Sequence, residues 1–171
     1  MRRFHAGQVL VAAAFAALAG TALVNYPQLG LQPDGSYLIP TGQRLTPAGV
    51  HFEVNDRPLG MVLSPDGRRL AVVTGSNFAP RALHILDPDD GRMIHTQPLG
   101  DSFTGVAFSP DGQRVFIGGG SSGKVYFLRQ TETGYLEEPG VDLPGSAPSG
   151  LSVSPDGKRL FVALNLRNSV A

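Results

Sequence analysis

A thirteen-residue pattern occurs three times in this chain at a constant spacing of 45 residues, and no other feature of the sequence restricts the fold as strongly. The copies begin at Gly60, Gly105 and Gly150. Each has a glycine, three mostly apolar residues, the tetrapeptide Ser-Pro-Asp-Gly, one variable residue, an arginine and three mostly apolar residues. A period of about 40–45 residues with strand-like content is typical of the blades of a β-propeller.

The tetrapeptide has the chemistry of a tight turn. Proline presets φ at the first central position, aspartate hydrogen-bonds its own backbone, and glycine accepts the positive φ that closes the turn. Short runs of Val, Leu, Ile and Phe on both sides suit buried strands, so each copy predicts a β-hairpin. The expected structural turn residues are Ser64, Pro65, Asp66, Gly67, Ser109, Pro110, Asp111, Gly112, Ser154, Pro155, Asp156 and Gly157.

Further segments supply two more strands to each period. Residues 82–86 predict a third strand, 87–91 a turn, and 93–96 a fourth strand. In the second copy, residues 125–128 and the neighbours of Leu136 take the same parts. The sequence therefore predicts an all-β fold: a β-propeller fragment of about two and a half four-stranded blades, with repeats starting near residues 58, 103 and 148.

The third copy has its first hairpin and then the last residues of the chain, so we expect a truncated protein or gene fragment. Open strand edges favour association, and the chain is expected to be poorly soluble or oligomeric. Residues 51–54 alternate weakly and are expected to form an outer strand that would complete the last blade of a full ring.

The N-terminus has the composition of a secretory signal. Two arginines at positions 2 and 3 precede an uncharged run over 9–24, with an Ala-x-Ala site at 17–19. The run is shorter than the roughly 20 residues that span a bilayer, which favours cleavage over an anchor helix. We expect a signal at 1–24, a linker at 25–36, a partial propeller at 37–171, and a secreted or periplasmic location.

Composition excludes several classes of function. Lys+Arg and Asp+Glu are balanced at 14 each, which gives no electrostatic reason to expect nucleic acid. A membrane partner is expected only through an uncleaved anchor. The absence of cysteine excludes disulfides and thiolate catalysis.

Four sequence features resemble functional motifs but are better explained as structural features. Residues 118–124 resemble a P-loop, but Val125 stands where Ser or Thr should hold magnesium, so a Gly/Ser loop is favoured. Residues 87–91 resemble a calcium loop with misplaced ligands, so a hairpin turn is favoured. The histidines lack metal-ligand spacing, and the repeated turn serines are not set as nucleophiles. We expect no catalytic residue, no metal site and no cofactor.

A binding site is expected on the propeller face where first strands begin and the loops between second and third strands gather. The candidate ligand-binding residues are Arg57, Asn77, Asp101, Ser121, Lys124, Asn165 and Asn168, with Arg81, Ser102, Ser122 and Arg167 expected beside them. A solvated loop surface is the competing interpretation.

The repeat resembles the YVTN-type repeats of bacterial seven-bladed propellers, a group that includes lactonase-like proteins. Residues 58–60 and 148–150 carry the start of that pattern, and the name-giving tetrapeptide aligns with 71–74, 116–119 and 161–164, without its asparagine. Residues 38–49 resemble, more narrowly, the N-terminus of propellers fused to an alkaline-phosphatase-like phosphoesterase domain; the Gly/Ser stretch 118–125 also fits that subgroup.

The resemblance implies three alternatives for function. The first is an exported binding or scaffold module for an unknown ligand or protein, at the N-terminus of a larger protein such as a phosphoesterase fusion. The second is a lactonase-like enzyme that hydrolyses a sugar lactone. The third is an extracytoplasmic protein-interaction platform. The remaining blades, and any catalytic domain, would come from sequence after residue 171.

Overall fold

The computed structural model describes residues 28–46, 48–76 and 79–171, so the predicted signal segment lies outside the described residues. The chain divides into two units, Met1–Val50 and His51–Ala171. Among the described residues, no helix is long and apolar enough to cross a membrane. The first unit contains a small antiparallel sheet of β1 (Gly30–Leu31), β2 (Tyr37–Leu38) and β3 (Arg44–Leu45).

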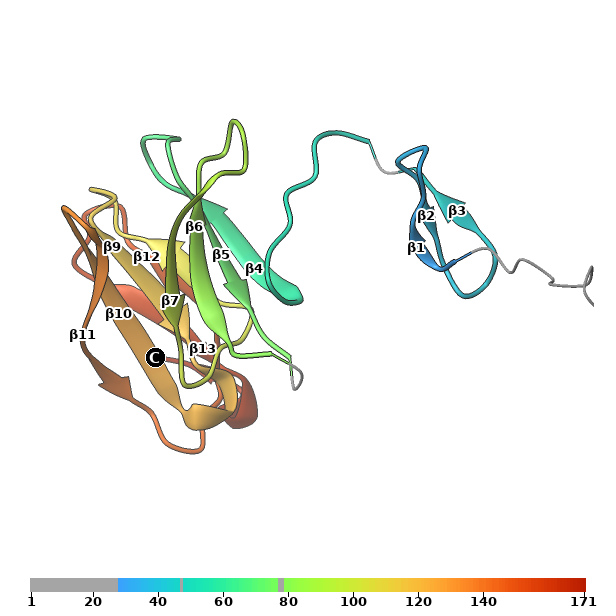
Figure 1. Cartoon of the computed structure of the whole chain (residues 1–171). Helices are drawn as coiled ribbons and strands as arrows, with labels where there is room; N and C mark the ends of the chain where they lie inside the picture. Colours follow the sequence, from blue (N-terminus) through green and yellow to red (C-terminus); the bar gives the residue numbers. More distant parts are fainter. Residues whose placement is uncertain (1–27, 47, 77–78) are drawn as a thin grey trace, which may run out of the picture. The chain divides into compact units, whose positions relative to one another are not determined.

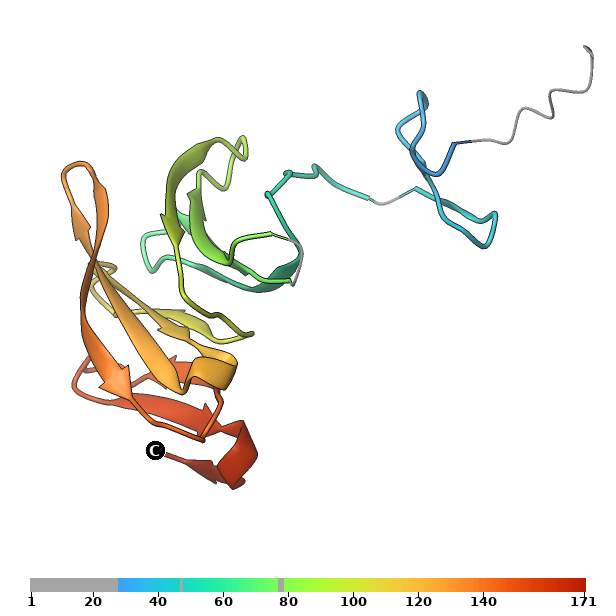
Figure 2. The ribbon, with the colours of Figure 1, turned by 60° about the horizontal axis from the view of Figure 1, so that its bottom comes forward.

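The second unit is built from three antiparallel sheets in which strands adjacent in sequence pair with each other. Figure 2 shows the three sheets following one another in chain order. This all-β architecture is consistent with a propeller fragment and confirms the predicted class. The first sheet contains β4 (Pro58–Leu63), β5 (Leu70–Thr74), β6 (Ala82–Leu86) and β7 (Met93–Pro98). The second contains β8 (Val106–Phe108), β9 (Arg114–Gly118), β10 (Lys124–Thr131) and β11 (Gly134–Asp142). The third contains β12 (Pro148–Val153), β13 (Leu160–Leu164) and β14 (Ser169–Val170) (Figure 1).

The three Ser-Pro-Asp-Gly segments form the same turn in each sheet. In the first, the Ser64 hydroxyl donates to Asp66 Oδ1 at 2.6 Å and accepts the Arg69 N–H at 2.9 Å. The Gly67 N–H donates to the Ser64 carbonyl at 2.9 Å, and φ at Gly67 is 71°. The serine, aspartate and glycine of each copy are therefore explained by the turn itself.

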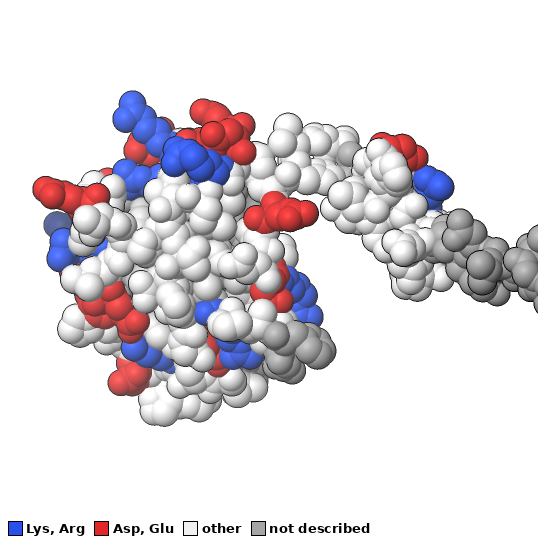
Figure 3. All heavy atoms as spheres, viewed as in Figure 1, with Lys and Arg blue, Asp and Glu red and all other residues white. Residues whose placement is uncertain are grey.

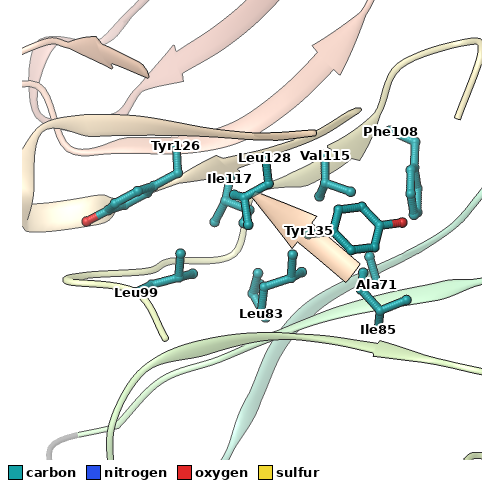
Figure 4. Close-up of a cluster of buried hydrophobic side chains, with 11 residues drawn as sticks. Ala71, Leu83, Ile85, Leu99, Phe108, Val115, Ile117, Tyr126, Leu128 and Tyr135 are labelled. Atoms are coloured by element: carbon teal, nitrogen blue, oxygen red, sulfur yellow. The ribbon is translucent and has the colours of Figure 1, made fainter. Parts of the chain in front are cut away.

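The main core lies between the first and second sheets. Leu83 and Ile85 of β6 face Ile117 and Leu128 of the second sheet, and all four side chains are fully buried (Figure 4). A smaller cluster around Val125 joins the second sheet to the third. Both faces of the middle sheet are thus covered. This explains why its inner strands β9 and β10 have nearly continuous apolar sequences.

Glycine at the start of the first two repeats permits close approach between neighbouring sheets. A Cβ at Gly60 would lie 2.1 Å from the Thr104 carbonyl oxygen, and one at Gly105 would lie 1.6 Å from the Ser149 carbonyl oxygen. Any side chain at these positions would force the sheets apart. At Gly150 the only contact is Ala163 Cβ at 3.8 Å.

Residues 51–54 form no strand here. The outer strand expected there belongs to the last blade of a full ring, so it stays a prediction for the full-length protein. The Phe52 ring instead packs over Gly91, in the turn between β6 and β7, where a Cβ would lie 2.1 Å from Phe52 Cδ1. An isolated segment gains strand structure only by pairing with a sheet edge, and here the aromatic contact fixes the segment in another way.

Candidate functional site

The loops that precede the first strands and the loops between second and third strands enclose a pocket in the second unit. Its volume is about 290 Å³. The residues that shape it include Arg81, Asp101, Phe103, Ser121, Asn165 and Leu166. These residues come from all three sheets, which is the convergence of loops expected at this face of a propeller.

Asp101 holds these loops together. Its Oδ1 accepts the Ser102 N–H at 2.8 Å, and its Oδ2 accepts the Ser121 hydroxyl at 2.6 Å and the Ser122 N–H at 2.9 Å. Arg81 forms an ion pair with Oδ1. The Asp101 side chain is only 8% exposed, against 30% for Arg81. Both carboxylate oxygens therefore have structural partners, and the arginine is the more accessible charge.

The glycine-rich segment that resembles a P-loop contains a short 3₁₀ helix, η1 (Gly120–Ser122), and β10 begins after Gly123. Gly120 and Gly123 have φ of 53° and 70°, which only glycine adopts without strain. The Gly119 N–H donates to the Lys124 carbonyl at 2.8 Å and closes the loop. This tight turn presents the Ser121 hydroxyl and the Ser122 N–H to Asp101.

Other candidate residues lie apart from the pocket lining. Arg57 is exposed and donates to the Gly75 carbonyl at 3.3 Å. Lys124 pairs with Glu137 at 2.7 Å, and this partner raises the pKa of the lysine. Asn168 follows the 3₁₀ helix η2 (Asn165–Arg167) with φ of 48°. Asn77 lies outside the described residues.

Of the seven candidate ligand-binding residues, the structure brings together Asp101, Ser121 and Asn165. Sequence reasoning did not find the apolar wall formed by Phe103, Ala147 and Leu166. Two signals were available: Phe103 and Leu166 are large apolar residues inside otherwise polar loops. Ala147 gave no such signal. Its φ is 48°, a conformation that costs energy for a residue with a Cβ and that the sequence does not reveal.

One histidine of the second unit, His84, is buried inside a strand. His84 of β6 is fully buried, and its ring nitrogens lie 3.0 Å from Thr74 Oγ1 and 3.2 Å from Thr96 Oγ1. Burial lowers the pKa of His84, which favours the neutral ring. The interpretation of His84 as a strand residue fits this environment.

Both oxygens of the Asp101 carboxylate are engaged by donors of the neighbouring loops. A general base must be free to accept a proton from the reacting group, whereas both Asp101 oxygens already accept hydrogen bonds. Within the described part of the chain, no group of three or more His, Cys, Asp or Glu side chains could hold a metal ion. Acidic and basic side chains are interspersed on the visible face of the second unit, which has no single-sign surface there (Figure 3).

No family model matches the chain, and no curated protein matches its sequence. Solved structures do match the fold. The periplasmic gluconolactonase of Pseudomonas aeruginosa matches with a TM-score of 0.52 and 24% identity, over 79% of this chain and 43% of that one. A Bacteroides uniformis protein described as a 6-phosphogluconolactonase matches with 0.51 and 21%, over 77% and 43%.

Hydrazine synthase of Kuenenia stuttgartiensis also matches, with a TM-score of 0.52 and 20% identity, over 63% of this chain and 37% of that one. The chain thus spans less than half the length of each of these three structures. At these identities the likeness establishes the fold alone. Enzymes with different names share it, so function has to be argued from the pocket.

Proposed function

We propose that this chain is part of an exported β-propeller module that binds a small molecule in the loop pocket and does not transform it. The observation that carries the proposal is the Asp101 carboxylate, whose two oxygens are occupied by Arg81, Ser102, Ser121 and Ser122. This cluster is a rigid frame around a cavity, with no free acid or base.

Export and fusion belong to the same proposal. The uncharged run over 9–24 supports export, and the periplasmic location named for one structural neighbour is in keeping with it. The resemblance of residues 38–49 to the opening of phosphoesterase fusions supports a role as the N-terminal binding module of a larger protein. In that setting the pocket would select the molecule and another domain would act on it.

A second candidate is lactone hydrolysis, which the gluconolactonase fold supports. That reaction needs a base to activate water and donors for the developing oxyanion. Arg81 and Asn165 could serve as donors, and Asp101 would have to leave its hydrogen bonds to act as the base.

One assay separates the two functions. The purified chain is incubated with δ-gluconolactone, and acid release is followed with a pH indicator. We expect the uncatalysed rate. Turnover that disappears in Asp101→Asn, while the variant keeps the circular dichroism spectrum of the parent chain, would establish the enzyme and overturn the binding proposal.

Binding itself is tested with ligand-observed NMR on a set of small polar fragments. Leu166→Trp should abolish the signals of bound fragments. Leu166 lines the pocket and is 70% exposed, so an indole ring at this position would fill the cavity. Val170→Trp is the matched control, since Val170 is 67% exposed and does not line the pocket. Equal signals in both variants would place any binding elsewhere.

A further inference from the structure

We infer that the pocket selects a small carboxylic acid with an apolar body, bound through Arg81 and Asn165 and lying against Phe103 and Leu166. This inference rests on the proposed binding function and names the class of ligand for the same pocket. Three features of the described residues support it: the accessibility of the two charges, the donors that the lining offers, and the apolar wall.

The first feature is an asymmetry between the two charged residues of the lining. Asp101 is 8% exposed and its oxygens face backbone and hydroxyl donors, whereas Arg81 is 30% exposed. Arg81 and Asp101 are the charged residues that line the cavity. The negative charge is therefore covered and the positive charge reaches the cavity, so an anion is favoured over a cation.

The second feature is the number of donors available. A guanidinium carries five N–H donors in a planar fork that matches a carboxylate, and the pair with Asp101 is made through Nη1. Asn165 is exposed, and its backbone N–H already donates to the Ala147 carbonyl at 3.2 Å. Asn165 also lines the pocket, and its side-chain amide adds a further donor for an acceptor-rich group.

The third feature is the apolar wall. Phe103 is 41% exposed and Leu166 is 70% exposed, although both are large apolar side chains. With Ala147 they line one pocket together with Arg81 and Asn165. A volume of about 290 Å³ is at the lower limit for ligand pockets, so the body of the ligand must be small. A single ring or a short branched chain fits these limits.

The test compares benzoate with benzyl alcohol, which has the same ring without the charge, and with glucose, a neutral polyol of similar size. Binding to the full chain is measured by ligand-observed NMR titration. We expect benzoate to bind at least about tenfold more tightly than benzyl alcohol, the effect of one charge-assisted pair. We expect glucose to bind more weakly still.

Two variants locate the carboxylate. Arg81→Gln should weaken benzoate binding about tenfold and leave benzyl alcohol binding unchanged. Because Arg81→Gln also removes the Asp101 ion pair, Leu166→Glu provides a second test that leaves the pair intact. The Leu166→Glu side chain places a negative charge at the pocket. It should weaken benzoate binding several-fold, and the weakening should be smaller at high salt. Val170→Glu, outside the lining, is the control.

The outcomes separate the inference from the function on which it rests. Equal affinity for benzoate and benzyl alcohol overturns the selection of an acid. So does an Arg81→Gln variant that binds neither compound, if Leu166→Glu still binds both. Binding of glucose that Leu166→Trp abolishes, without binding of benzoate, leaves the binding function standing and rejects this ligand class. If none of the probes binds at about 10 mM, a concentration at which even millimolar affinities are visible, this ligand class is rejected; if the polar fragments also fail to bind, the binding function fails as well.

Discussion

Asp101 connects its own loop to two segments of the second unit that are distant in the sequence, at residue 81 and at residues 121–126. Its carboxylate meets Arg81, Ser121 and the Ser122 N–H, and its backbone N–H donates to Tyr126 Oη at 3.0 Å. Hydrogen bonds to a charged group are stronger than neutral ones. The residue is therefore expected to stabilise the loops that enclose the pocket as well as to define their positions.

Replacing Asp101 by alanine should lower the free energy of unfolding by about 3 kcal/mol, because Arg81 and three donors would lose a largely buried partner. Urea denaturation measures the change. Glu53→Ala, at an exposed position with no ion pair given by the structure, serves as the control. A loss below about 1 kcal/mol, typical of an exposed pair, would contradict the role assigned to Asp101.

His84 gives the fold a dependence on pH. Its folded-state pKa is lowered by burial, whereas the unfolded chain has a value of about 6.5. The unfolded state therefore binds more protons as the pH falls through 6.5, and stability must decline from about pH 7 towards pH 5. Urea denaturation at both pH values measures the decline. His84→Gln should reduce it and His51→Gln should not; the same decline in all three proteins would rule out His84 as its source.

At the scale of the element, the repeated hairpin could be predicted almost completely from the sequence. Serine, aspartate and glycine are all used by the turn itself, through contacts no more than five residues apart. Local chemistry of this kind is independent of the rest of the fold. The loops around Asp101 could not be predicted in this way. Arg81 and Ser121 are each 20 residues from Asp101 in the sequence, and no local sequence pattern indicates that they contact it.

The absence of a strand at residues 51–54 in this chain has the same origin. Weak alternation indicates that a segment could be a strand, but only a neighbouring strand makes it one. Here the Phe52 ring meets Gly91, and that contact could not be read from the alternation. Likewise, the apolar wall of the pocket depends on where Phe103 and Leu166 are carried by their loops, rather than on the residues beside them.

Ser109→Ala tests the hairpin. The Ser109 hydroxyl donates to Asp111 and accepts the Arg114 N–H at 2.9 Å, and Ser109 is only 8% exposed. The variant should lose about 1–2 kcal/mol of stability, measured by urea denaturation. Ser154→Ala, at the half-buried equivalent in the third sheet, should lose less. An equal loss at both positions would mean that burial does not strengthen the turn.

At the scale of the whole molecule, equivalent residues differ in exposure between sheets. Phe116 is 9% exposed in the middle sheet, whereas Phe161, at the same repeat position, is 44% exposed. On β4, Met61 and Leu63 are 71% and 51% exposed. Apolar sheet faces of this kind favour association, which supports the expectation that the chain is oligomeric or poorly soluble.

Phe161→Lys should therefore shift the 171-residue chain towards the monomer in size-exclusion chromatography with light scattering. Lys at a sheet surface opposes association through charge and solvation. The control is Phe103→Lys, since Phe103 is similarly exposed but belongs to the pocket. A parent chain that elutes as a sharp monomer and melts cooperatively would refute the expected association.

The glycines at Gly60 and Gly105 have a consequence for the curvature of the assembly. Each lets two neighbouring sheets come to backbone contact, and a side chain there would change the orientation of one sheet relative to the next. In a repeat protein whose units contact only their neighbours, an error in that orientation is multiplied by the number of units. A single methyl group at Gly105 would thus act as a wedge, and its effect would grow with distance along the array.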